Sequence, residues 1–231
     1  MYSKGWMQIV ECNNGGSDVV CSTAQNWCNL QILETLLGKW DVYYVPSEDP
    51  DPYPPALEPY LNSSKVTSKI GSQNMWAQTN LKVHFQFTAT GDWMRSSSQN
   101  LEMVINSGVR TIVYDGDADF ICNYMGVEAM VSQSLVSSSP SSGPSLIRLL
   151  HAQVDSLKTS LSAEYASQNF ATYTVNGKPA GLYKNAGTFS YLRVFGAGHE
   201  VPAYLWRGVP RGAAALQMFT QIMSGHSLSS T

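Results

Sequence analysis

The chain has 231 residues, of which 43% are hydrophobic, so it can form one large domain or two small ones around a packed core. Charged residues make up 13%, the net charge is −3 and no run of Lys or Arg occurs, which argues against nucleic acid as a partner. No apolar run reaches the roughly 18 residues of a membrane span, and MYSKGWMQIVEC at the N-terminus lacks the apolar core of a signal peptide.

The four cysteines are unevenly spaced. Cys12, Cys21 and Cys28 form a cluster, and Cys122 is far away in the sequence. The spacing C-x8-C-x6-C suits a disulfide but lacks the CxxC pairs of a zinc site. One clustered cysteine is left over, and it pairs either with Cys122 or outside this chain. Low charge, abundant Tyr and Trp, and a cysteine cluster together favour a secretory origin, and Asn62 begins a glycosylation sequon.

The N-terminal half contains three predicted elements and one loop. Apolar residues near helical spacing predict a helix over 26–37. The proline-rich run 45–59 predicts an irregular surface loop, because proline lacks a backbone donor. The alternation in KVHFQFT predicts a strand over 82–88, and a helix over 98–107 is expected to end at Gly108.

The stretch RTIVYDGDADFICN begins as a strand over 110–114 and then turns through crowded acids. A helix over 123–131 follows the turn. Helix, strand, turn and helix in this order are the unit of an open α/β sheet, whose functional groups lie at the carboxyl ends of strands. The acids resemble a calcium loop, but Gly126 stands where the ligand glutamate would be, so calcium is not expected.

Residues 132–154 interrupt this pattern with a Ser- and Pro-rich stretch. One interpretation is an ordinary loop followed by a second helix over 146–161. The other is an insertion foreign to the fold, for example untranslated sequence retained in the gene model. If 132–154 is removed, four apolar residues fall on one face of a continuous helix: Val127, Val131, Leu157 and Leu161.

The C-terminal third shows clearer signals. ATYTVNGKPAGLYK predicts a hairpin over 171–184 that turns at Asn176 and Gly177. TFSYLRVF predicts a strand over 188–195, which ends in the sequence GAGH. A closing helix is expected over 210–223.

Two predicted strands are therefore followed by residues that could take part in catalysis. One strand end carries the carboxylate of Asp119, and the other carries the imidazole of His199. A buried aspartate that accepts a hydrogen bond from a histidine fixes the tautomer of the ring and stabilises its protonated form. Each residue alone is more often structural than catalytic. Asp115 and Asp117 are expected to hold the turn through local backbone hydrogen bonds.

Three stretches carry a family resemblance. YDGDADFICNYMG and YLRVFGAGHEVPAY are similar to the aspartate and histidine motifs of serine carboxypeptidases, and FTATGDWMR resembles a third stretch. The resemblance covers most of the chain except 132–154, and it corresponds to the C-terminal half of the family. It implies a partial α/β-hydrolase fold over 1–231, with a cysteine-stapled cap or excursion over 12–60.

The resemblance also implies residue roles. Asp119 matches the triad acid and His199 the general base. Glu200 departs from the methionine of well-known members, and a carboxylate there is expected to favour basic departing residues. Three further residues match positions that line the pocket for the side chain before the scissile bond: Trp93, Ile121 and Cys122.

The serine of such a triad is missing from this sequence. The nucleophile needs a G-x-S-x-G elbow, which occurs nowhere in the chain, and Ser145 and Ser190 both lack the second glycine. The resemblance therefore implies a serine carboxypeptidase that acts on peptide C-termini through a Ser-His-Asp mechanism, but a chain that is inactive by itself. A non-catalytic truncated homologue and an acyltransferase remain alternatives. No cofactor or metal is implied, the oligomeric state stays open, and the family is secreted or vacuolar.

Overall fold

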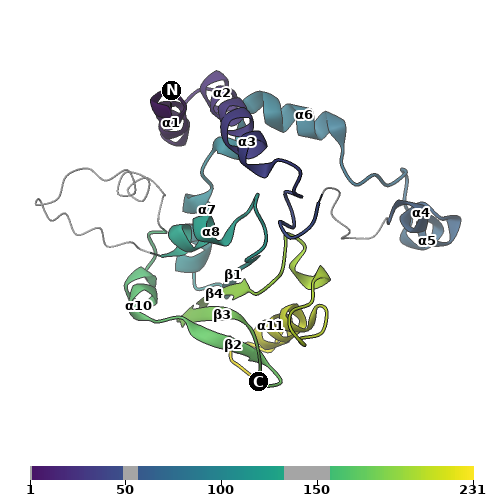
Figure 1. The fold of residues 1–231 in the computed structure, drawn as a ribbon, viewed down its shortest axis with the longest axis vertical. Coiled ribbons are helices and arrows are strands. Elements are labelled where there is room, and N and C mark those ends of the chain that lie inside the picture. The colour runs from purple at the N-terminus through teal and green to yellow at the C-terminus, as the bar shows by residue number, and fades with distance from the viewer. Residues whose placement is uncertain (1, 49–56, 133–156) are drawn as a thin grey trace, which may run out of the picture. The chain divides into compact units, whose positions relative to one another are not determined.

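The computed structural model describes residues 2–48, 57–132 and 157–231, and the chain divides into two compact units (Figure 1). The first unit consists of Met1–Gly38 and Pro52–Ser96, and the second of Lys39–Asp51 and Ser97–Thr231. Each unit is described separately below. In the described part of the chain, no helix is both long and apolar enough to cross a membrane.

The first unit begins with helices joined by a disulfide between Cys12 and Cys21, which are both buried. Cys28 and Cys122 are free thiols, so a disulfide within the cluster is confirmed and the pairing of the odd cysteine with Cys122 is not found. The predicted helix over 26–37 is helical throughout, although it starts earlier, where Ser17 caps the backbone of Val20. The successive elements are α1 (Tyr2–Asn13), α2 (Asp18–Cys28), the π-helix η1 (Asn29–Leu33) and α3 (Glu34–Leu37).

The predicted strand over 82–88 is wrong, because this segment is the helix α6 (Leu81–Thr90). The side chain of Asn80 accepts a hydrogen bond from the Val83 backbone at 3.2 Å, and Gly91 ends the helix in a left-handed conformation. Because both ends of the segment carry helix caps, the segment forms a helix although its apolar residues alternate as in a strand. The neighbouring elements are α4 (Glu58–Leu61), α5 (Ser64–Ile70) and the 3-10 helix η2 (Asp92–Met94).

The proline-rich segment 45–59 lies mostly outside the described residues. Residues 45–48 are irregular, as predicted, but Glu58 already begins α4. Pro59 occupies the first turn of that helix, where its missing donor leaves no hydrogen bond unmade.

The second unit contains a four-stranded mixed sheet in the order β1-β4-β3-β2. β1 and β4 are parallel, and their paired residues run from Thr111 opposite Phe189 to Gly116 opposite Val194. β2 and β3 form the predicted hairpin, which turns at Asn176 with a positive φ of 51°. The strands are β1 (Thr111–Gly116), β2 (Ala171–Val175), β3 (Lys178–Ala186) and β4 (Phe189–Val194).

Helices in the second unit follow the predicted order, and the α/β class is confirmed. The helix after the acidic turn starts where the side chain of Asn123 accepts a hydrogen bond from Gly126 at 3.0 Å. The helices are α7 (Ser98–Asn106), α8 (Tyr124–Val131), α10 (Ser162–Ser167), the 3-10 helix η3 (Val201–Ala203) and α11 (Ala213–Met223).

The suspected insertion over 132–154 falls almost wholly outside the described residues, but its two flanks are described. The backbone N–H of Leu157 donates to the carbonyl of Met130 at 2.9 Å. Without 132–154, Leu157 would follow Met130 by four positions, so this is the bond that a continuous α-helix would make. Residues 157–161 are not helical, which contradicts the described part of a second helix over 146–161.

All four residues that the insertion hypothesis places on one face belong to a single core cluster. Val131 and Leu157 are buried in it, and Val127 and Leu161 pack against it. We infer that 132–154 is an insertion at the end of α8. Sequencing the mature transcript tests whether it is retained untranslated sequence, and a transcript that encodes the whole stretch would rule that origin out.

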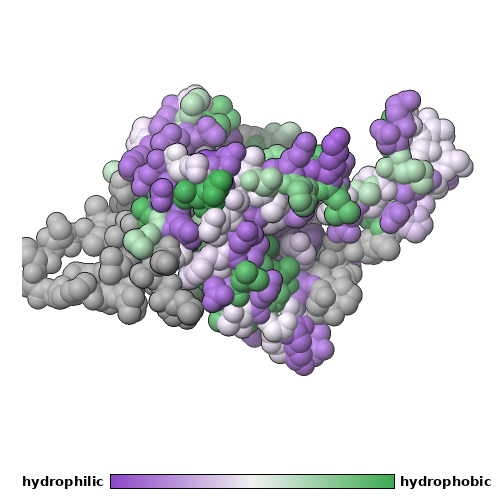
Figure 2. Space-filling model, turned by 90° about the horizontal axis from the view of Figure 1, so that it is seen from above, coloured by the Kyte–Doolittle hydropathy of each residue, from purple (hydrophilic) through white to green (hydrophobic). Residues whose placement is uncertain are grey.

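Large apolar side chains also remain on the surface. Leu81 and Phe85 of α6 are 77% and 74% exposed, and Met125 of α8 is 61% exposed. Apolar and hydrophilic surface are interspersed on the face shown in Figure 2. Isolated exposed apolar residues are normal for folded proteins, whereas contiguous ones favour association.

Candidate active site

The site lies at the carboxyl ends of β1 and β4. Because these strands are parallel and in register up to Gly116 and Val194, the loops that follow them leave the same edge of the sheet. The N–H of Asp117 donates to the carbonyl of Val194 at 3.1 Å, and the N–H of Ala118 donates to that of Ala197 at 2.9 Å. Two backbone hydrogen bonds therefore join the acidic loop to the histidine loop.

Two glycines allow this close approach. A Cβ on Gly116 would lie 2.1 Å from the carbonyl oxygen of Ala197, so no other residue fits there. Gly196 has a φ of +63° in the histidine loop, a left-handed conformation that glycine adopts without strain. Its N–H donates to Oδ1 of Asp117 at 2.6 Å. Asp117 thus holds the turn as predicted, but its bond reaches across to the other loop instead of staying local.

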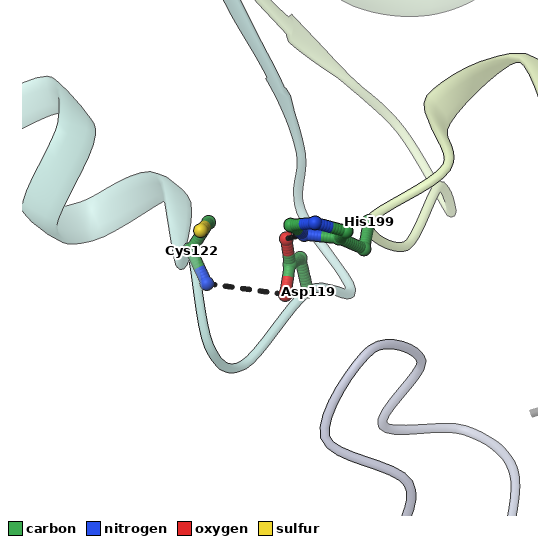
Figure 3. Close-up of side chains that lie close together, drawn as sticks. All are labelled: Asp119, Cys122 and His199. Atoms are coloured by element: carbon green, nitrogen blue, oxygen red, sulfur yellow. Dashed lines mark hydrogen bonds and ion pairs between the residues drawn. The ribbon is translucent and has the colours of Figure 1, made fainter. Parts of the chain in front are cut away.

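Asp119 and His199 form the pair that the sequence predicts (Figure 3). Oδ2 of Asp119 lies 2.8 Å from Nδ1 of His199. The aspartate side chain is 3% exposed, whereas the histidine side chain is 41% exposed, so the ring can meet a substrate. Since a carboxylate only accepts, Nδ1 of His199 is the donor in this hydrogen bond, and Nε2 is not part of it.

Residues 41–45, which we call the brace, support both loops, and sequence reasoning overlooked them. The carbonyl of Tyr43 accepts the N–H of His199 at 2.9 Å, and the two rings lie 5.2 Å apart. The carbonyl of Val42 accepts the N–H groups of Phe120 and Ile121, each at 3.2 Å. The brace therefore fixes the backbone on either side of the histidine–aspartate pair.

Asp41 in turn holds the brace. Its Oδ1 accepts the N–H groups of Tyr43 at 2.6 Å and Tyr44 at 2.9 Å, and the residue is 2% exposed. An aspartate whose side chain bonds the backbone two residues later is a familiar turn signal, so WDVYY could have revealed this role.

Replacing Asp41 with alanine should destabilise the second unit by about 2–4 kcal/mol, because two partly buried N–H groups lose their carboxylate acceptor. Urea unfolding of the two proteins measures this loss. Asp41→Asn is the matched control, since its amide oxygen can still accept both bonds and about half or more of the stability should return. Equal loss in both variants would contradict the hydrogen-bonding role.

Asp115 does not hold the turn, contrary to the prediction. Its carboxylate is 6% exposed and accepts the hydroxyl of Tyr191 at 3.1 Å on both oxygens. Burial raises the pKa of Asp115 to about 7, the Tyr191 bond opposes this rise and the nearby Glu128 adds to it. Arg193 pairs with Glu128 at 3.0 Å and partly offsets the two carboxylates. A buried acid-rich cluster thus lies at the end of β1, just before the site.

The remaining predicted site residues have different surroundings. Ile121 is 44% exposed, and the N–H of Cys122 donates to Oδ1 of Asp119 at 3.2 Å, so these two lie on the aspartate loop. Glu200 follows the histidine and accepts the Tyr204 hydroxyl at 3.3 Å. Trp93 belongs to the first unit, where its ring meets His84 edge-on at 5.2 Å. Their roles in a substrate pocket stay predictions.

The serines considered as nucleophiles do not join the pair. Ser190 lies within β4, is fully buried and donates to the side chain of Asn185 at 2.7 Å. Ser145 lies outside the described residues.

Asn62, the predicted glycosylation site, has a structural role in the first unit. Its Nδ2 donates to the carbonyl of Trp76 at 2.9 Å, and its Oδ1 accepts the N–H of the same residue at 2.6 Å. Asn62→Ala should therefore cost about 1–3 kcal/mol of stability. Ser64→Ala also destroys the sequon but keeps the amide, so it should leave the thermal transition of the unglycosylated protein unchanged. A similar loss in both would assign the effect to something other than these bonds.

Comparisons with known proteins found a matching family and several similar proteins. A family model described as serine carboxypeptidase matches residues 12–225. Carboxypeptidase S1 of Penicillium janthinellum is 32% identical over 226 residues, which are 96% of this chain and 47% of that protein. Carboxypeptidase Y of Schizosaccharomyces pombe is 30% identical over 203 residues, 84% of this chain and 18% of that protein. The solved structure of a prohormone-processing carboxypeptidase from Saccharomyces cerevisiae can be superimposed on 78% of this chain, which corresponds to 42% of the solved chain. The TM-score is 0.47 and the sequence identity is 17%.

A buried aspartate paired with an accessible histidine, each following one of two parallel strands, is the acid–base arrangement of α/β hydrolases. The match over residues 12–225 narrows this class. The chain belongs to the serine carboxypeptidase family. It spans less than half the length of the two curated relatives named above.

Proposed function

We propose that this chain supplies the histidine and aspartate of a serine carboxypeptidase site and that by itself it does not hydrolyse peptides. The observation that carries the first part is the 2.8 Å contact between Asp119 and His199. The second part is supported by the sequence, which has no G-x-S-x-G elbow in its 231 residues. The substrates are peptides or proteins with a free C-terminus.

The geometry suits proton transfer in such a reaction. Nε2 of His199 would take the proton of an attacking serine and then give it to the leaving amine. Asp119 would hold the ring through Nδ1 and stabilise its positive charge. The nucleophile and the donors that stabilise the tetrahedral oxyanion must come from residues other than these two.

A chimera tests the proposal. The part of Penicillium carboxypeptidase S1 that this chain does not match would be joined to this chain, and release of C-terminal amino acids from a blocked dipeptide would be measured. Activity should appear only in the chimera, and Asp119→Asn in the chimera should lower kcat by about 10⁴. Cleavage by the unmodified chain that His199→Ala abolishes would contradict the predicted inactivity. A folded chimera that stays inactive would count against the relay.

Glu200 would influence which C-terminal residues are released most readily. A carboxylate beside the catalytic histidine would attract a departing residue with a basic side chain. In the chimera, Glu200→Gln should lower kcat/KM for substrates ending in Arg or Lys and leave substrates ending in Leu nearly unchanged. Product analysis with an alcohol present separates hydrolysis from acyl transfer, since an ester product would favour the acyltransferase alternative.

A secretory or vacuolar location fits the Cys12–Cys21 disulfide, because disulfides persist in oxidising compartments. The alternative of a non-catalytic homologue rests on the same missing elbow. The chimera separates the two, since a degenerate site would stay inactive even when a serine is supplied.

A further inference from the structure

Three side chains that can bind a metal converge at the site. One ligand atom from each of Asp119, Cys122 and His199 lies within 4.8 Å of the other two, and no other group of this kind occurs among the described residues. Asp119 is buried, whereas Cys122 and His199 are exposed, so an ion from solvent can reach them. Figure 3 shows the three side chains gathered from the aspartate and histidine loops.

Their chemistry matches one class of ion. A thiolate, an imidazole and a carboxylate are the ligands of Zn²⁺ and of its softer analogue Cd²⁺, whereas Mg²⁺ and Ca²⁺ prefer sets made of oxygen alone. Three protein ligands leave the fourth tetrahedral position for water. Oδ2 of Asp119 and Nδ1 of His199 are already 2.8 Å apart, and each ligand atom would lie about 2.0–2.3 Å from a bound ion.

The backbone around the site limits that movement. The N–H of Cys122 is bonded to Oδ1 of Asp119, and the N–H of His199 is held by the carbonyl of Tyr43. The three side chains therefore start close together, so that binding needs side-chain rotation more than loop movement.

We propose that Asp119, Cys122 and His199 form a chelating site for a thiophilic divalent cation such as Zn²⁺. The site competes with the proton relay. A cation on Nδ1 of His199 displaces the hydrogen bond to Asp119, and a cation on Nε2 occupies the nitrogen that would act as the base. The site is thus inhibitory for the family's chemistry and independent of whether a serine is present.

Binding should release a proton. A cysteine binds a divalent metal as the thiolate, and an ordinary cysteine thiol titrates at about 8.5, above neutral pH. The free thiol is therefore protonated at neutral pH and must lose its proton to bind the ion, so affinity should rise with pH.

Cadmium titration of the full-length chain with its Cys12–Cys21 disulfide intact tests the site. Cd²⁺ should produce an ultraviolet thiolate-to-metal charge-transfer band at one equivalent, with release of about one proton per ion in weakly buffered solution. Cys122→Ser should abolish the band. Cys28→Ser is the matched control, because it removes the other free thiol and should leave the band unchanged.

Two further variants separate a chelate from a simple thiol adduct. His199→Ala and Asp119→Asn should each weaken binding at least tenfold if all three side chains bind the ion. An unchanged affinity in both would leave a lone thiol adduct and overturn the proposal, as would a band that persists in Cys122→Ser. Circular dichroism of each variant confirms that the fold is intact. Zn²⁺ should displace Cd²⁺ from the site and remove the charge-transfer band, whereas Mg²⁺ should not.

Discussion

Deleting residues 132–154 should raise the free energy of unfolding of the second unit by about 2–3 kcal/mol. Closing a loop of about two dozen residues costs roughly this much entropy, which the deletion removes. The Leu157 N–H already donates to the Met130 carbonyl, and after the deletion this bond would belong to one continuous helix. Urea unfolding measures the gain, and hydrogen exchange at Leu157 reports on the helix.

A deletion of 132–155 provides the matched control for this result. It is longer by one residue, so it turns Leu157 and Leu161 by about 100° away from the core face of the helix. This variant should be less stable than the deletion of 132–154 by about 2 kcal/mol or more, because the buried Leu157 and the partly buried Leu161 lose their packing. Equal stability of the two deletions would contradict the proposed helix register.

Replacing Asp115 with asparagine should stabilise the protein at alkaline pH and have little effect in acid. Burial raises the pKa of Asp115 to about 7, whereas an aspartate in an unfolded chain titrates near about 4. Between these values the folded chain keeps the proton and the unfolded chain loses it. Stability therefore falls as pH rises through this window, and the loss is complete above about pH 7.

The expected gain for Asp115→Asn above pH 7 is about 3–4 kcal/mol, since each unit of pKa shift corresponds to about 1.4 kcal/mol. The amide can still accept the Tyr191 hydroxyl, and Arg193 keeps Glu128 as its partner. Urea unfolding at about pH 5 and about pH 8 measures the difference. Asp92→Asn, at an exposed carboxylate, removes the same charge and should not change the pH dependence. Parallel pH curves for wild type and Asp115→Asn would contradict the argument.

Local signals predicted the elements that position the site. The β-branched and aromatic residues before the acidic turn, the Asn176-Gly177 turn and the glycine-rich GAGH loop are each local signals, and all three appear in the structure. The contact between Asp119 and His199 was predicted because both follow strands, and parallel strands bring their carboxyl ends to one edge.

Other features depend on contacts between distant residues and were missed. The alternation in 82–88 indicated a strand, but caps at Asn80 and Gly91 favour a helix, and alternation alone does not show whether a partner strand exists. Asp115 was expected to bind its own turn, whereas Tyr191, far along the chain, supplies its partner. The role of the brace at 41–45 was missed, because its support of His199 is made by backbone atoms that the sequence does not distinguish.

The hydrogen bond between Leu157 and Met130 has a practical consequence for handling this protein. Met130 and Leu157 lie within hydrogen-bonding distance of each other, so a folded guest domain whose own termini lie close together can take the place of the sequence between 132 and 157. A fluorescent reporter placed between 132 and 157 would label the protein without touching either end of the chain. It would also leave the histidine–aspartate pair undisturbed, since that pair is built on other loops.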